Sequence, residues 1–60
     1  MNDEQLNRLV ARLRECEALA MAAAEQAPIG GSARATLLGK ADGLGDALRW
    51  IARAREGRLD

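Results

Sequence analysis

The stretch LLGKADGLGDALRWIARAR, residues 37–55, decides the fold of this 60-residue chain because it carries two apolar stripes at helical spacing. The first stripe consists of Leu37, Ala41, Leu44, Leu48 and Ile51. The second stripe consists of Gly43, Ala47, Trp50 and Ala54. One stripe can pack against the first half of the chain, and the other then needs a neighbour from outside it. Trp50 is the expected anchor of that interface, because Trp brings a large apolar area and is enriched at binding hot spots.

The first half of the chain carries a helix start signal followed by helical periodicity. Asn2 and Gln5 have the spacing of a capping box, and Asp3 suits the positive end of the helix dipole. We therefore expect a helix over residues 3–26. Its apolar residues recur every three or four positions and predict an intramolecular seam of Leu6, Leu9, Leu13, Cys16, Ala20, Ala23 and Ala27, widened by Val10.

The run ALAMAAA, residues 18–24, is apolar on every side of this helix. Such a segment usually has more than one neighbour, whereas a hairpin supplies a single one. We therefore assign its large side chains, Leu19 and Met21, to an interface between chains.

Residues 27–32, APIGGS, are the clearest break in the chain. The proline lacks an amide hydrogen and disfavours helical angles at the residue before it, while the paired glycines permit a sharp reversal. Ser32 can cap a second helix, which we expect over residues 33–56 with Gly57 as its stop. Matched helix lengths and a short loop predict an antiparallel hairpin.

Three glycines, Gly39, Gly43 and Gly45, lie inside the second predicted helix and each costs about 1 kcal/mol relative to Ala. One alternative is therefore a break at residues 40–43, which gives three helices. We favour the continuous helix because the apolar seam crosses this segment without a change of phase. Gly43 also lies on the stripe of Trp50, where a missing side chain would let another helix approach.

The composition favours assembly with other chains. A chain of this length buries only about 60% of the surface that its unfolded form exposes, so its fold needs crosslinks, metals or partners. One Cys and no His provide neither an internal disulfide nor an ordinary zinc site. Zero net charge and the lack of an 18-residue apolar run predict a cytoplasmic protein without membrane contact. The high Ala and Arg content suits the GC-rich genome of a phage or bacterium.

A second set of residues suits an anionic ligand. Ser32 and Arg34 stand at the start of the second helix, where free amides attract anions, and Lys40 follows them. Arg49 and Arg53 belong to a group of arginines that a hairpin would gather at its open end, namely Arg8, Arg12, Arg14, Arg49, Arg53, Arg55 and Arg58. The carboxylates that share this end are those of Asp3, Glu4, Glu15, Glu56 and Asp60. We favour the simpler interpretation, a capped turn and solvated, paired charges, and keep anion binding by Ser32, Arg34, Lys40, Arg49 and Arg53 as the alternative.

Side chains for catalysis are scarce. The chain has no His or Tyr, and its carboxylates lack the clustering of an acid and base pair. Asp42 and Asp46 could hold a divalent cation from one helix face, but exposure to solvent is the simpler interpretation. Cys16 is interpreted as an inert thiol on the core seam, and the alternatives are a crosslink across a dimer axis or a redox role. We expect no enzyme, no cofactor and no metal site.

Residues 44–50, LGDALRW, follow a proline and a turn rich in glycine and serine. This arrangement resembles the second-helix pattern Leu-acid-acid-Ala-x-x-Trp of the hairpin domain in phage anti-CBASS proteins, which assemble into oligomers that sequester cyclic nucleotide signals. Gly45 stands where that pattern has its first acidic residue, and Ala33 separates the serine and arginine that are adjacent in the family's turn. The resemblance implies an oligomeric hairpin with a nucleotide ligand, and it carries over no ligand-contacting residue.

The sequence thus predicts an all-α protein, an antiparallel two-helix hairpin that assembles into a dimeric four-helix bundle or a higher oligomer. The predicted function is a non-enzymatic interaction module, a phage or bacterial regulator or inhibitor that acts by oligomerisation and protein binding. The alternative is an oligomer that sequesters an anionic nucleotide signal, as an anti-defence sponge, or that binds nucleic acid through its arginine-rich end.

Overall fold

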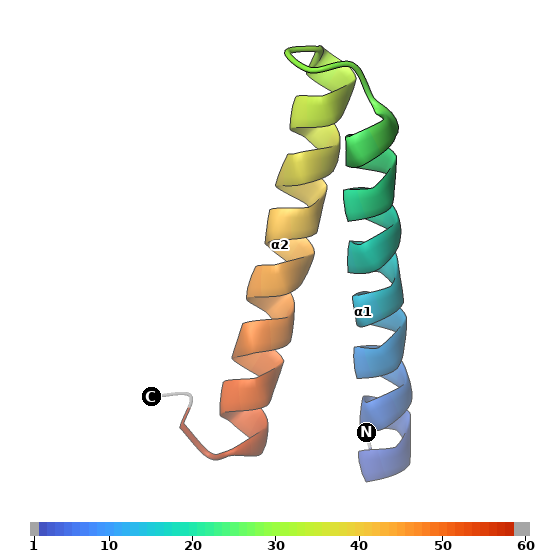
Figure 1. Ribbon diagram of the computed structural model, residues 1–60. Helices are drawn as coiled ribbons and strands as arrows, with labels where there is room; N and C mark the ends of the chain where they lie inside the picture. The colour runs from blue at the N-terminus through green and yellow to red at the C-terminus, as the bar shows by residue number, and fades with distance from the viewer. Residues whose placement is uncertain (1, 59–60) are drawn as a thin grey trace.

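The computed structural model describes residues 2–58, which form two helices joined by a tight turn (Figure 1). Helix α1 spans Asp3–Gln26 and helix α2 spans Ser32–Arg55, each with 24 residues. The two helices pack against each other as an antiparallel hairpin, which confirms the predicted all-helical fold. Helix α2 crosses positions 40–43 without a break. Met1, Leu59 and Asp60, including the Asp60 carboxylate assigned to the arginine-rich end, lie outside the described residues.

The outer ends of the two helices are closed by local sequence signals. The Asn2 side-chain oxygen accepts a hydrogen bond from the backbone amide of Gln5 at 2.8 Å. The Gln5 side-chain oxygen accepts one from the backbone amide of Asn2 at 3.4 Å. These two bonds form the predicted capping box. At the end of α2, Gly57 has a φ of +72°, and the amides of Gly57 and Arg58 bond to carbonyls of the last helical turn. This Schellman motif makes Gly57 the stop of α2, as predicted.

The turn between the helices differs from its prediction in one respect. The Gly31 amide donates to the Pro28 carbonyl at 3.1 Å, and Gly30 has a φ of +83°, a value that favours glycine at the third position of a type II turn. Gly31 then takes the N-cap position without a side-chain hydrogen bond, and Ser32 is the first residue of α2. The prediction that Ser32 caps this helix was wrong, because the turn already brings the chain into helical geometry one residue earlier.

The helices touch along a seam that is built from small residues near the turn and larger ones toward the open end. The buried positions are Val10, Ala20, Ala24, Ala41 and Gly45. The half-buried leucine and isoleucine side chains beside them are those of Leu6, Leu13, Leu37, Leu44, Leu48 and Ile51. Because the distance between helix axes follows the size of the side chains at the contact, the helices lie closest below the turn and diverge toward their free ends (Figure 1).

In part of α1, the residues that face α2 are shifted by one position from the predicted seam. Leu9 and Ala23 were expected on the seam, but both are exposed, whereas Val10 and Ala24 are buried. Cys16, expected in the core, is half-buried. Both positions of each neighbouring pair are apolar, so periodicity alone does not select between them. Packing against a single neighbouring helix leaves room for one narrow line of contact.

The hairpin is one layer thick. Its Cα atoms span 40 × 24 × 12 Å, and no large side chain in the described part of the chain is fully buried. Domains usually bury their apolar faces between two or three layers of secondary structure. Neither described helix is long and apolar enough to cross a lipid bilayer.

Candidate interaction surface

The second apolar stripe of α2 lies on the side of the helix that does not face α1. The Trp50 side chain is 54% exposed, Gly43 and Ala54 are exposed, and Ala47 is half-buried. A Cβ atom added at Gly43 would meet nothing within 4 Å. The stripe is therefore open to a neighbour at Gly43, Trp50 and Ala54.

The guanidinium of Arg53 lies over the ring face of Trp50. The guanidinium carbon of Arg53, one turn further along α2, lies 5.2 Å from the centroid of the indole. A guanidinium over Trp at this distance makes a cation–π interaction, worth about 0.5–1 kcal/mol at an exposed site. The pair holds the indole and the cation together, so a partner that contacts Trp50 also meets Arg53.

Part of α1 extends this surface. Glu17 covers Gly45 on one flank of the seam between the helices. A helix turns by about 100° per residue, which places Leu9 and Cys16 of α1 on the other flank of the seam, away from Glu17. Ala47 of α2 lies on this second flank as well. The flank continues around α2 to its second stripe, so the combined surface, called here the Trp50 face, consists of Leu9, Cys16, Gly43, Ala47, Trp50 and Ala54. Leu9, 38% exposed, was missed because periodicity placed it on the seam.

Leu19 and Met21 do not join this surface as one patch. Both are exposed, at 67% and 44%. Residues that are two positions apart in a helix are separated by about 200° around its axis, so these two side chains lie on opposite sides of α1. They also belong to the half of α1 near the turn, whereas Trp50 belongs to the half of α2 near the open end. The structure therefore groups four of the six predicted interface residues.

The residues considered for anion binding are spread over the hairpin. Arg34 donates from Nη1 to the Ala24 carbonyl at 3.1 Å, beside the turn. Lys40 is exposed further along α2, and Ser32 is exposed at the start of that helix. Arg49 is paired with Asp46, and Arg53 covers Trp50. The five side chains do not converge on one site in a single copy of the chain.

Ion pairs neutralise much of the arginine-rich open end. Arg8 pairs with Glu4 at 2.8 Å and Arg12 pairs with Glu15 at 3.6 Å. Arg58 pairs with Glu56. All of these side chains are exposed, so each pair contributes about 0–1 kcal/mol to stability. Within residues 2–58, no three His, Cys, Asp or Glu side chains form a group that could hold a metal ion.

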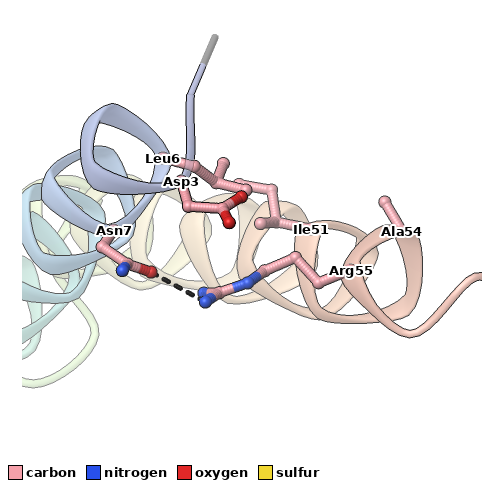
Figure 2. Close-up of a pocket in the computed structure, with 6 residues that line it drawn as sticks. All are labelled: Asp3, Leu6, Asn7, Ile51, Ala54 and Arg55. Atoms are coloured by element: carbon pink, nitrogen blue, oxygen red, sulfur yellow. Dashed lines mark hydrogen bonds between the residues drawn. The ribbon is translucent and has the colours of Figure 1, made fainter.

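A groove of about 540 Å³ opens between the diverging ends of the helices (Figure 2). Leu6 from α1 and Ile51 and Ala54 from α2 provide its apolar lining. Asp3 lies on one side of the groove, and Arg55 reaches across from α2 to Asn7, where its Nη2 donates to Oδ1 at 2.7 Å. Sequence reasoning missed this groove, because it arises from the divergence of the helices and not from a motif. Ala54 belongs to both the groove and the Trp50 face.

Gly45 is a second residue that sequence reasoning undervalued. A Cβ atom at this position would lie 2.8 Å from Glu17 Oε2, so the glycine lets the Glu17 side chain cross the seam. The close approach predicted at Gly43 is toward another chain, and it stays a prediction. The available signal was that Gly45 follows Ala41 by four residues and precedes Leu48 by three, which places it on the seam.

No protein-family model matches the chain, and the comparisons with curated proteins and with solved structures also give no match. The class of the protein is therefore defined by its geometry. It is a helical hairpin that buries one apolar seam within itself and leaves a second apolar face open. The resemblance of residues 44–50 to phage anti-CBASS hairpins stays a prediction from the sequence.

Proposed function

We propose that the protein is a non-enzymatic interaction module that works as a homo-oligomer, with the Trp50 face as the contact between copies. The proposed assembly is a dimeric four-helix bundle or a higher oligomer. The observation that carries the proposal is the exposed second stripe of α2, with Trp50 more than half exposed and Gly43 free of contacts.

The chain exposes more surface than a compact monomer of its mass, and the excess is about the area of one protein interface. The hairpin exposes 4727 Å², whereas a compact monomer of 6.4 kDa is expected to expose about 3,800 Å². The excess of about 900 Å² is close to the area of about 800 Å² that each partner covers in a standard protein interface. A second hairpin placed on the Trp50 face would remove an excess of this size.

The interior of the hairpin supports the same proposal. Its four buried apolar residues are Val10 and three alanines, and its leucines along the seam are only half-buried. Fully burying a Leu side chain stabilises a fold by about 1.5–3 kcal/mol. A second layer of helices would complete the burial of side chains such as Leu44 and Ile51, and folding would then be coupled to assembly.

In its biological role, we propose a small cytoplasmic regulator or inhibitor from a phage or bacterium, which binds a protein partner as an oligomer. The Ala-rich and Arg-rich composition supports the proposed origin. The test of assembly is the molar mass of Trp50→Ala compared with the unmodified protein by light scattering. The proposal expects a lower mass for the variant, and an unchanged mass would place the tryptophan outside the contact between copies.

A second candidate function rests on residues 44–50, LGDALRW, and their resemblance to anti-CBASS hairpins. In this case the oligomer sequesters an anionic nucleotide, and symmetry brings together arginines that are separate in one copy. A thermal-shift screen with cyclic nucleotides tests it, because a ligand at 100 times its dissociation constant stabilises the fold by about 2.7 kcal/mol. Nucleic-acid binding through the same arginines would weaken steeply between about 50 and 200 mM salt. No shift with any nucleotide would exclude the sponge function.

A further inference from the structure

The open end of the hairpin carries a cationic knob and a groove whose lining includes one carboxylate and one guanidinium, those of Asp3 and Arg55. The first is the knob formed by the Trp50 indole and the Arg53 guanidinium, which lie 5.2 Å apart. The second is the groove lined by Leu6, Ile51 and Ala54, with the Asp3 carboxylate at its side (Figure 2). The knob is apolar and positive, while the groove combines an apolar lining with an Asp3 carboxylate that has no ion-pair partner within residues 2–58.

We infer that the Trp50–Arg53 knob of one copy occupies the groove at the open end of a second copy. This inference rests on the proposed self-assembly and specifies its contact. The indole would cover Leu6 and Ile51 of the second copy, and the Arg53 guanidinium would meet the Asp3 carboxylate.

The charges of the two features support a second copy as the occupant. Within residues 2–58, neither Asp3 nor Arg53 has an oppositely charged group within 4 Å in its own hairpin. The cation that lines the groove, Arg55, donates a hydrogen bond of 2.7 Å to Asn7, one turn after Asp3 on α1, and it makes no ion pair with the Asp3 carboxylate. The side of the groove that carries Asp3 therefore offers an anion to an incoming cation.

The sizes and positions of the two features also agree. A Trp side chain buries about 150–250 Å² when it is enclosed, and the groove, at about 540 Å³, has a ligand-sized volume. Ala54 connects the groove to the Trp50 face, so one continuous surface carries both the knob and its receptor. When two such copies meet about a two-fold axis, each knob can enter the groove of the other, which is the condition for a closed, isologous contact.

The test is a charge exchange followed by sedimentation velocity at a fixed protein concentration. The variants are Asp3→Arg, Arg53→Asp and the double variant Asp3→Arg/Arg53→Asp. Each single variant places like charges in every contact, so we expect its self-dissociation constant to rise by about tenfold or more. The double variant restores opposite charges in every contact, and so does an equimolar mixture of the two single variants. We expect both samples to regain the sedimentation coefficient of the unmodified protein.

The matched control is Glu4→Arg, which makes the same charge change in the first turn of α1 at a residue outside the groove. We expect it to assemble like the unmodified protein, with circular dichroism to verify helix content in all variants. The inference is overturned if the single variants assemble normally, or if mixing them restores nothing. If Trp50→Ala still dissociates the oligomer in either case, the proposed assembly stands and only this contact is wrong. A monomeric unmodified protein would overturn the proposed assembly itself.

Discussion

Arg34 donates a hydrogen bond from its guanidinium to the Ala24 carbonyl, 3.1 Å away, and so joins the first turn of α2 to the last turns of α1. The last turn of α1 has no basic residue of its own. Arg34 therefore supplies the positive charge that suits the negative end of this helix, and it does so from across the turn.

We expect Arg34→Ala to lower the free energy of unfolding by about 1 kcal/mol, because it removes a charged hydrogen bond and a favourable dipole interaction at a partly exposed site. Urea unfolding monitored by circular dichroism at one protein concentration measures the change. Lys40→Ala, at an exposed position of the same helix, is the control and should change stability by less than about 0.5 kcal/mol. Equal stability of the two variants would contradict a structural role for Arg34.

The helical glycines give a second prediction, because they differ in their surroundings. A Cβ atom at Gly39 would meet nothing within 4 Å, whereas one at Gly45 would lie 2.8 Å from Glu17 Oε2. We expect Gly39→Ala to stabilise the protein by about 1 kcal/mol through helix propensity. Gly45→Ala should stabilise the protein less than Gly39→Ala does, because the Glu17 carboxylate must move. Thermal unfolding checks the order of the two variants, and a larger gain at Gly45 would contradict the close crossing.

Gly43 tests the contact between copies separately from the fold of the hairpin. Within one copy a Cβ atom at Gly43 would meet nothing within 4 Å, and Gly43 lies on the Trp50 face. We expect Gly43→Leu to raise the self-dissociation constant by about tenfold or more, because its side chain would overpack the closest approach of the second copy. Sedimentation equilibrium measures this effect, with Ala11→Leu as the control that keeps the assembly, because Ala11 is exposed and lies on the side of α1 away from Leu9 and Cys16. If both variants assemble equally, Gly43 does not face the second copy.

Sequence patterns were sufficient for the architecture of this protein. The capping box at Asn2, the reversal at Pro28 and the stop at Gly57 are local signals, and the hairpin follows from them. The continuity of α2 through its glycines followed from the unbroken phase of the Leu37 to Ile51 stripe. These features depend on residues close together in the chain, so a linear reading could find them.

The details that sequence patterns missed depend on how the two helices meet. The selection of Val10 over Leu9 as the seam residue is set by the rotation of α1 against α2, and both residues are apolar. The groove at the open end exists because alanines near the turn bring the axes together while larger side chains separate the other end. The hydrogen bond from Arg55 to Asn7 joins residues 48 positions apart and has no local signature.

The central proposal is that one hairpin leaves an apolar face that a second copy covers. Sedimentation equilibrium of the unmodified protein over a range of concentrations tests it most directly. We expect a molar mass at least twice the chain mass of 6.4 kDa, with dissociation and loss of helix content on dilution. A fully helical monomer whose mass stays at that of one chain across the concentration range would contradict the account.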